Sequence, residues 1–255
     1  MRIENNDFDI RWFDTLESTN EYCKLLDPKT VEEFTVISAR SQTSGIGQRG
    51  NTWNSEAGKN LTFSLILKPN FLAADEQYSL TMALSLAVAE TLEELFSVLH
   101  SPFPVYIKWP NDIYVGDRKI CGILATNQLV SNRITQSICG IGLNINQIAF
   151  PDWIPNPTSL QLLTGREFNL DDVLHNLLTK ISHRYWQLRN PHNYNSIKES
   201  YLDRLYRLGI PSRYVHNGRT LRATITGIDR FGHLQLQTDD GQSLSCAMKD
   251  IQFII

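Results

Sequence analysis

Two apolar, β-prone runs, residues 34–39 and 61–67, enclose a glycine-containing segment, SGIGQRGNTW (residues 44–53). Each run has the length of a buried strand, and the segment between them is rich in turn-forming residues. Its glycines have the spacing G-x-G-x-x-G, which dinucleotide-binding loops and kinase glycine-rich loops share. The residues after the third glycine decide between these interpretations.

A dinucleotide-binding loop requires a helix that opens at the third glycine and an acidic residue about twenty positions later. Gly50 is followed by NTWNSEAGKN, which lacks helical periodicity, and residue 70 is Asn. The run Val105–Lys108 imitates the kinase strand-lysine motif, but neither H-R-D-x-x-x-x-N nor D-F-G occurs. A Walker loop fails as well, because Gly50 is followed by Asn-Thr and the G-K-[ST] motif is missing.

The segment is therefore a glycine-containing loop between two strands with one arginine, Arg49. Such a loop can gather backbone N–H groups around an anion, or fold over a ligand. A flexible surface hairpin is the alternative.

The remaining pattern predicts an α/β (α+β) fold with a central mixed β-sheet flanked by helices. Strands are expected near 10–13, 34–39, 61–67, 105–107, 112–115, 119–125 and 134–143, and helices over 18–27, 78–99, 171–188 and 194–206. After residue 207 the pattern changes to short strands separated by turns, which predicts a small β-barrel of about five strands. We therefore expect a catalytic domain over 1–207 and a barrel domain over 208–255.

Composition excludes several classes. The formal net charge is −3, which gives no general electrostatic reason to bind nucleic acid or an anionic membrane. The N-terminus lacks the pattern of a signal peptide, and the apolar stretch 80–88 is too short to span a bilayer. The four cysteines are scattered without a C-x-x-C pair, which predicts reduced thiols and a cytoplasmic location.

The stretch KWPNDIYVGDRKICGILATN, residues 108–127, places two lysines on adjacent predicted strands. Lysine is rare on a buried strand unless it is paired, so Lys108, Lys119 or both should face an anionic ligand or a carboxylate. An exposed strand face with Lys119 in solvent is the alternative.

Four motifs in this order resemble the signatures of biotin protein ligases. They are STN at residues 18–20, the glycine segment ending in RGNTW at 49–53, KWPND at 108–112 with K-x-x-G-I-L at 119–124, and GIGLN at 140–144. The resemblance implies a class II synthetase-like sheet and an SH3-like C-terminal domain. It also implies a two-step reaction: biotin and ATP give biotinyl-5′-AMP, and a lysine of a biotin carboxyl carrier domain of a biotin-dependent carboxylase then takes the biotin.

The resemblance also implies roles for individual residues. Lys119 would bridge the biotin carboxyl group and the α-phosphate, and it forms the catalytic set with Arg49 and Lys108. The biotin site would comprise Ser18, Thr19, Asn20, Gln42, Gly45, Ile46, Gly47, Gln48, Lys119 and Gly122. The nucleotide site would comprise Arg49, Trp53, Asn111, Asp112 and Asn144, with ATP accompanied by Mg²⁺ whose ligands stay open. For residues 18–20, plain helix capping is the alternative.

The chain departs from the family pattern G-R-G-R-[RG]-G, since Ile46 and Gln48 occupy the two usual arginine positions. Arg49 with Lys108 and Lys119 could suffice, Arg40 could substitute, or the adenylate could be held less tightly. We expect Arg49→Ala to loosen the adenylate and to leave biotin binding largely intact.

Seventeen residues precede Ser18, too few for a winged-helix domain, so a ligase-only form that does not bind DNA is expected. Two other functions stay open: a lipoate-type ligase or transferase on the same scaffold, and a non-catalytic biotin-binding module. A homodimer that pairs sheet edges is a further possibility, and no membrane association is expected.

Overall fold

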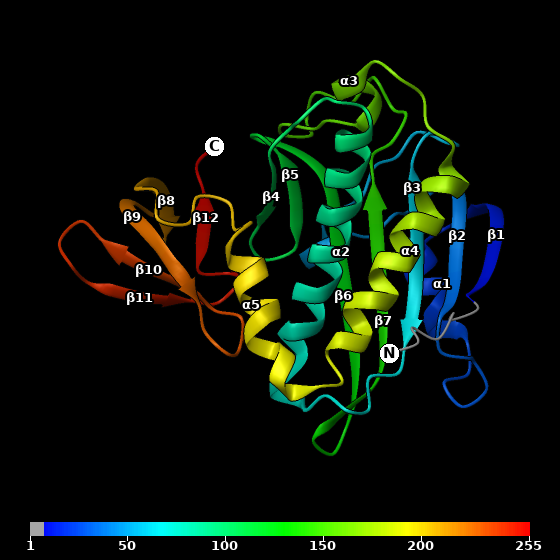
Figure 1. The fold of residues 1–255 in the computed structure, drawn as a ribbon, viewed down its shortest axis with the longest axis horizontal. Helices are drawn as coiled ribbons and strands as arrows, with labels where there is room; N and C mark the ends of the chain where they lie inside the picture. Colours follow the sequence, from blue (N-terminus) through cyan, green and yellow to red (C-terminus); the bar gives the residue numbers. More distant parts are fainter. Residues whose placement is uncertain (1–7) are drawn as a thin grey trace.

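The computed structural model describes residues 8–255 and contains two β-sheets, of seven and five strands. The larger sheet has the order β1-β2-β3-β7-β6-β5-β4 (Figure 1). Only the pairing of β1 with β2 is parallel, which confirms the predicted mixed sheet. Its strands are β1 (Asp9–Leu16), β2 (Thr35–Gln42), β3 (Leu61–Leu67), β4 (Val105–Lys108), β5 (Asp112–Val115), β6 (Arg118–Val130) and β7 (Arg133–Leu143).

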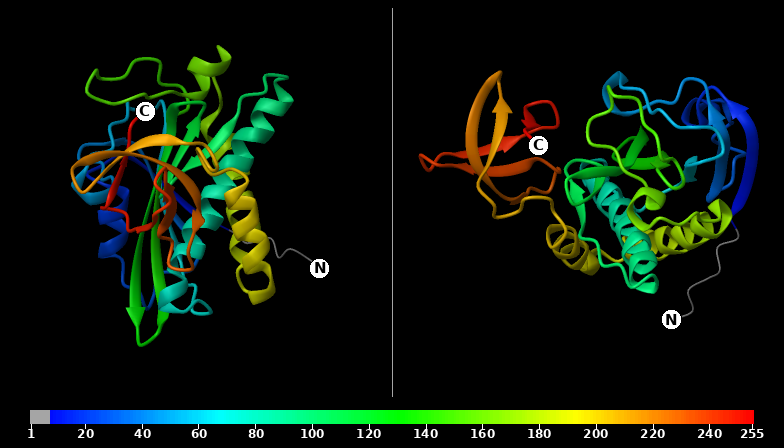
Figure 2. Two further views of the ribbon diagram at one scale, coloured as in Figure 1. Left: turned by 90° about the vertical axis from the view of Figure 1, so that its left-hand side faces the viewer. Right: turned by 90° about the horizontal axis from the view of Figure 1, so that it is seen from above.

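Helices cover both faces of this sheet. Seen from above in Figure 2, α2 (Gln77–Val98), α4 (Leu170–Gln187) and α5 (Tyr194–Leu202) lie along one face. The short helix α1 (Thr19–Leu25) packs on the other face, against β2, β3 and β7. Neighbouring strand residues accordingly belong to different cores: Leu65 joins the large core under α2, and Ile66 joins the small core under α1.

The strand β3 shows how the two faces are used. All seven of its residues are buried, because helices lie on both sides. Leu61, Phe63, Leu65 and Leu67 face the large core. Ser64 points to the opposite side, where its hydroxyl group contacts α1. A polar residue inside the run LTFSLIL therefore marks the face on which the functional site is built.

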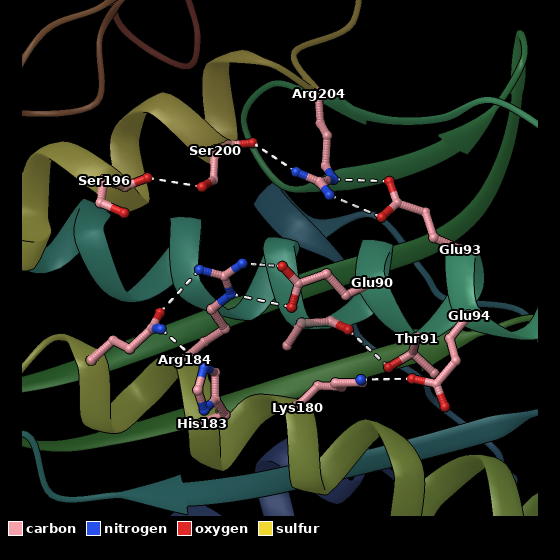
Figure 3. A network of polar contacts seen from close by, with 12 residues as sticks. Glu90, Thr91, Glu93, Glu94, Lys180, His183, Arg184, Ser196, Ser200 and Arg204 are labelled. Atoms are coloured by element: carbon pink, nitrogen blue, oxygen red, sulfur yellow. Dashed lines mark hydrogen bonds and ion pairs between the residues drawn. The ribbon is translucent and has the colours of Figure 1, made fainter. Parts of the chain in front are cut away.

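Ion pairs fasten the helices to one another on the outer side of the layer (Figure 3). Arg184 of α4 makes a two-point contact with Glu90 of α2, and Arg204 does the same with Glu93 at 2.9 Å for both bonds. Lys180 pairs with Glu94 at 2.6 Å. These contacts fix the layer that backs the sheet.

The smaller sheet is antiparallel, with the order β11-β10-β9-β8-β12. Its strands are β8 (Ser212–His216), β9 (Arg219–Ile228), β10 (Leu234–Thr238), β11 (Ser243–Cys246) and β12 (Ile251–Phe253). The expectation of about five strands is confirmed, although the sequence pattern does not single out β12. The helix α3 (Leu160–Thr164) is a further element outside the predicted set.

Smaller features of the chain also bear on the sequence expectations. Gly50 ends a 3₁₀ turn, η1 (Gln48–Gly50), and no helix follows it, as the residues after it indicated. Further 3₁₀ turns are η2 (Ala74–Glu76) and η3 (Pro191–Asn193).

All four cysteines are free and buried. Among the helices of residues 8–255, none has the length and apolar character needed to cross a membrane.

Candidate active site

A cavity of about 1090 Å³ lies on the face of the large sheet opposite α2. Its floor is the surface of β7 and β6, and its far wall comes from β8 and from residues 248–253 of the small sheet. Two segments cover it: the glycine-rich segment (residues 44–53) and a second segment (residues 148–157), here called the proline-rich segment. Both lie on the side of the sheet away from the helix layer (Figure 2, right).

The cavity collects most of the residues that the sequence singled out. Those at its wall are Ser18, Thr19, Asn20, Gln42, Ile46, Gly47, Gln48, Trp53, Lys108, Asn111, Asp112, Lys119, Gly122 and Asn144. Gly45 is buried within the glycine-rich segment and does not line the cavity, and a side chain there would collide with the Trp53 carbonyl oxygen. Arg49 lies in η1. Arg40 is directed toward β1, with its guanidinium over Trp12.

The start of α1 forms one wall from neutral polar groups. The Thr19 backbone N–H donates to Gln42 Oε1 at 2.7 Å. The Ser64 hydroxyl lies 2.8 Å from Thr19 Oγ1 and 2.9 Å from Asn20 Oδ1. The Ser64 hydroxyl is placed to donate to either oxygen, and its single proton reaches one of them at a time. The network holds these groups in fixed orientations before any ligand arrives.

Ser18 also caps α1, accepting from the Glu21 backbone N–H at 3.5 Å. The sequence Ser18-Thr19-Asn20-Glu21 has the S-x-x-E pattern of a capping box, but only this half of it forms, because the Glu21 carboxylate accepts from Lys24 at 2.6 Å. Capping and a role at the cavity are therefore compatible for Ser18.

Glycines on β7 make room for side chains that lie flat on the floor. A side chain on Gly142 would overlap the indole ring of Trp53, and one on Gly140 would begin 2.5 Å from Asn20 Nδ2. The Trp53 ring also covers Gly122 on β6. Because Gly140 and Gly142 have no side chains, Asn20 and Trp53 can pack directly against the backbone of β7.

A β-bulge brings the central lysine to the cavity. Asp112 pairs with Gly122, but Tyr114 pairs with Lys119, so Ile120 is an extra residue in β6. If the pairing continued without a bulge, Tyr114 would lie opposite Ile120, and Lys119 would point to the other face of the sheet. With the bulge, Lys119 Nζ lies 2.6 Å from Asp112 Oδ1, and the two side chains are 30% and 19% exposed. The solvent-exposed alternative for Lys119 is therefore wrong.

Lys108 is the second cation at the wall. Its Nζ lies 4.6 Å from the centre of the Phe253 ring and 5.4 Å from that of Tyr114, so it bridges the two sheets through cation–π contacts. Burial lowers the pKa of Lys108, and the nearby Asp112 carboxylate opposes this shift. The charge of Lys119 lowers the pKa of Lys108 as well, so the two lysines and the Asp112 carboxylate act on one another electrostatically.

Several polar atoms in the cavity region are buried without a hydrogen-bond partner among the described residues: Trp53 Nε1, Asn144 Oδ1 and Thr158 Oγ1. Asn144 Nδ2 donates to the Thr158 carbonyl at 3.0 Å, which fixes the orientation of the free Oδ1. Asn111 is used differently, since its amide donates to the Ile123 carbonyl and holds the KWPND turn against β6. Buried polar atoms of this kind are rare unless they have a use.

The glycine-rich segment is folded back on itself. Ile46 and Thr52 form an isolated bridge, and the Trp53 N–H donates to the Gly45 carbonyl at 2.8 Å. Gln48, at a usual arginine position, donates from Nε2 to the Met248 sulfur at 3.2 Å. The segment therefore reaches across the cavity to the C-terminal domain.

Sequence reasoning missed the proline-rich segment, with Phe150 and Trp153, and the wall that the small sheet supplies, including the turn with Met248 and Lys249. An available signal was the sequence PDWIP, which places a tryptophan in a proline-rich loop. Trp153 is 63% exposed, as expected of a side chain at a cavity mouth rather than in a core.

Comparison with known proteins agrees with this geometry. The Biotin/lipoate A/B protein ligase family matches residues 12–144, which contain the floor and most of the wall. The chain belongs to this family. Residues 213–252 match the Biotin protein ligase C terminal domain. Within a family that includes both biotin and lipoate ligases, this second match favours the biotin ligases.

Individual relatives point the same way. The bifunctional ligase/repressor BirA of Bacillus subtilis is 32% identical over 237 residues, covering 90% of this chain and 70% of that protein. The biotin–[acetyl-CoA-carboxylase] ligase of Paracoccus denitrificans is 28% identical and is covered to 94%, against 89% of this chain. The structure of the Aquifex aeolicus biotin protein ligase with biotin and ATP has a TM-score of 0.79 at 26% identity, covering 96% of this chain and 98% of that one.

Proposed function

We propose that this protein is a biotin–protein ligase, which makes biotinyl-5′-AMP from biotin and ATP and then transfers biotin to one lysine of a biotin carboxyl carrier domain. One observation carries the proposal: a single cavity joins a neutral hydrogen-bonding wall at Thr19 and Gln42 to a cationic wall at Lys108 and Lys119. The ureido ring of biotin is neutral and needs fixed donors and acceptors. Its carboxylate and the phosphates of ATP are anions.

In the first step, a carboxylate oxygen of biotin attacks the α-phosphorus of ATP, and the bond to the bridging oxygen of pyrophosphate breaks. Negative charge builds up on oxygen atoms that must approach one another. Lys119 would take up this charge by exchanging part of its contact with Asp112 for the substrate oxygens, and Lys108 would add a second positive charge.

The nucleotide would lie against Trp53 and Asn144 at the cavity wall, where the Asn144 amide is held by its bond to the Thr158 carbonyl. Among residues 8–255, no cluster of three or more His, Cys, Asp or Glu side chains is placed to hold a metal ion. Magnesium would arrive on the phosphates and keep most of its waters, and Asp112 at the cavity wall is a carboxylate that could contact it.

In the second step, the neutral ε-amine of the carrier lysine attacks the acyl carbon, the bond to AMP breaks, and the amine loses a proton. The glycine-rich segment would exclude water until the carrier arrives. In this chain the Gln48 contact with Met248 supports the segment at a position where a second family arginine is absent.

Incubation with ATP, magnesium and labelled biotin or lipoate, with and without a carrier domain, tests the proposal. We expect pyrophosphate release with biotin alone and label on the carrier only when the carrier is present. Release with lipoate instead would favour the lipoate-type alternative, against which the C-terminal match already counts. If neither acid is activated and Lys119→Ala changes nothing, the protein is a binding module.

A further inference from the structure

The two segments that cover the cavity are joined below by a pair of buried amide side chains, Asn60 and Gln147. Asn60 is 1% exposed and Gln147 is 2% exposed. Asn60 Nδ2 donates to Gln147 Oε1 at 2.6 Å, although 87 positions separate the residues in the chain. Neither residue lines the cavity.

Asn60 stands between the glycine-rich segment and β3. Its Nδ2 also donates to Ser55 Oγ at 3.0 Å, on the linker that follows the glycine-rich segment. Its Oδ1 accepts from the Ile145 backbone N–H at 2.8 Å, just beyond the end of β7. The side chain thus connects the entry of β3, which follows the glycine-rich segment and its linker, to the exit of β7, from which the proline-rich segment starts.

Gln147 makes the reciprocal connection from the exit of β7. Its Oε1 also accepts from the Glu56 backbone N–H at 3.0 Å. Its Nε2 donates to the Ala149 carbonyl at 2.7 Å and so turns the chain into the proline-rich segment. Each amide therefore bonds to both segments or to their immediate anchors.

Buried amides that share their hydrogen bonds in this way resist separate movement of the two segments. If the linker at Ser55 and Glu56 moved alone, one buried proton of Asn60 Nδ2 would lose its acceptor, and Gln147 Oε1 would keep only its bond from Asn60. If the two anchors move together, the shared bonds persist. Small connected networks of this kind stabilise a joint arrangement more than their separate bonds do.

We infer that Asn60 and Gln147 are positioning residues that make the glycine-rich and proline-rich segments open and close over the cavity as one unit. The inference rests on the proposed function for its purpose, which is to expose the reactive adenylate only when both covers release it. The coupling itself rests on the contacts alone.

The chain offers a matched control at the adjacent residue. Asn146 is 7% exposed and also makes two side-chain hydrogen bonds, to the Phe168 carbonyl at 2.8 Å and from the Phe168 N–H at 3.0 Å. These bonds tie the same strand exit to residue 168 rather than to the glycine-rich side. Loss of the Asn146 side chain therefore removes a comparable number of bonds without touching the amide pair.

Hydrogen–deuterium exchange of the ligand-free protein tests the coupling. Gln147→Met keeps the side-chain volume and removes both polar atoms; Asn60→Ser is a second variant, and Asn146→Leu is the control. The reporters are the Trp53 amide, bonded to Gly45, and the Ile154 amide, bonded to Pro151. We expect both amides to exchange about tenfold faster in the two test variants, and within about twofold of wild type in the control. Acceleration of one reporter alone, or an equal effect in the control, would overturn the coupling.

Release of a non-hydrolysable biotinyl-adenylate analogue supplies the second readout. We expect about tenfold faster release from each test variant, with biotin affinity changed by less than about twofold, and no further increase in Asn60→Ser/Gln147→Met. If the two substitutions multiply, the residues do not act as a unit. If wild-type protein neither releases pyrophosphate with biotin nor retains the analogue, the proposed function fails, whereas the exchange experiment still decides the coupling.

Discussion

The Trp109 indole N–H donates to the Gly232 carbonyl oxygen at 2.8 Å, a buried hydrogen bond between the KWPND turn and the β9–β10 turn of the small sheet. Gly232 has φ +85°, and a side chain there would overlap the ring of Tyr78 on α2. The Tyr78 hydroxyl in turn donates to the Pro110 carbonyl at 3.2 Å. The small domain is therefore seated directly behind a motif that forms the cavity wall.

Gly232→Ala should disrupt the packing of the small sheet against Trp109 and Tyr78. Gly241→Ala is the control. Gly241 has nearly the same backbone angle, φ +84°, but a side chain there would meet nothing within 4 Å. We expect Gly241→Ala to lower the free energy of unfolding by about 1–2 kcal/mol through backbone strain. Gly232→Ala should cost about 1–3 kcal/mol more because of the overlap with Tyr78. If urea denaturation gives equal losses of unfolding free energy for the two variants, the close packing of Gly232 against Tyr78 does not contribute to stability.

Lys119→Met should abolish most of the activation step. Removal of a positioned cation from a partly buried site typically lowers a rate by about 10²–10³-fold. The control is Lys59→Met, because Lys59 pairs with Glu167 at 3.2 Å on the exposed surface. We expect pyrophosphate release by the control to stay within about twofold of wild type. Comparable rates in the two variants would remove Lys119 from the chemistry.

Gly142→Ala should displace the Trp53 indole from the floor. The added methyl group overlaps the ring, whereas the methyl group of Gly122→Ala would lie 3.1 Å from it and needs only a small shift. We expect a non-hydrolysable biotinyl-adenylate analogue to bind about tenfold more weakly to Gly142→Ala, a change of ~1.4 kcal/mol. Calorimetric titration measures this affinity. Unchanged binding would mean that the position of Trp53 does not shape the adenylate site.

The ion pairs of the helix layer should contribute to stability but not to turnover. The Arg184 and Glu90 side chains are 15% and 19% exposed, against 33% and 47% for Lys180 and Glu94. Arg184→Met should lower the free energy of unfolding by about 2 kcal/mol, and Lys180→Met by less than about 1 kcal/mol. Both variants should keep their activity per folded molecule. A lower turnover per folded molecule in either variant would show that the ion pairs of the helix layer influence the active site.

Buried thiols should weaken the fold at alkaline pH. Burial raises the pKa of Cys23 and Cys139 from 9.0 to about 12. The stability that these neutral thiols contribute is therefore complete below pH 9 and is lost as the pH rises toward 12. The loss reaches about 1.4 kcal/mol per pH unit for each thiol. We expect a shallower decline in Cys23→Ala/Cys139→Ala, measured by urea denaturation between pH 8 and 11. If the unfolding free energy declines with pH as steeply in the double variant as in the wild type, the two thiols do not cause the decline.

Local patterns were sufficient for most of the large sheet and its helices, because their strands and helical faces repeat over many residues. They were insufficient for β12, whose three residues form a strand only because β8 offers a free edge. The helix α3 could have been found, since Ser159 caps its start and Gly165 ends it in a left-handed conformation.

The candidate site shows the same division. The motifs predicted most of the site residues that the structure places at the wall, but not the proline-rich segment or the residues of the small sheet. The G-x-G-x-x-G spacing does not say which glycines face a ligand, and Gly45 is needed for a close backbone approach instead. The placement of Lys119 depends on a bulge at Ile120 that no local pattern announces. The bond between Asn60 and Gln147 joins residues that only the folded sheet makes neighbours.

The cavity wall extends from Ser18 on α1 to Phe253 on β12, so a ligand inside it contacts both sheets at once. A molecule that binds only the complete wall stabilises the folded state by mass action, by about 2.7 kcal/mol at a concentration one hundred times its dissociation constant. This stabilisation is shared by both domains rather than confined to one. Saturating ligand should therefore merge their melting into one transition and protect linkers far from the cavity against proteases.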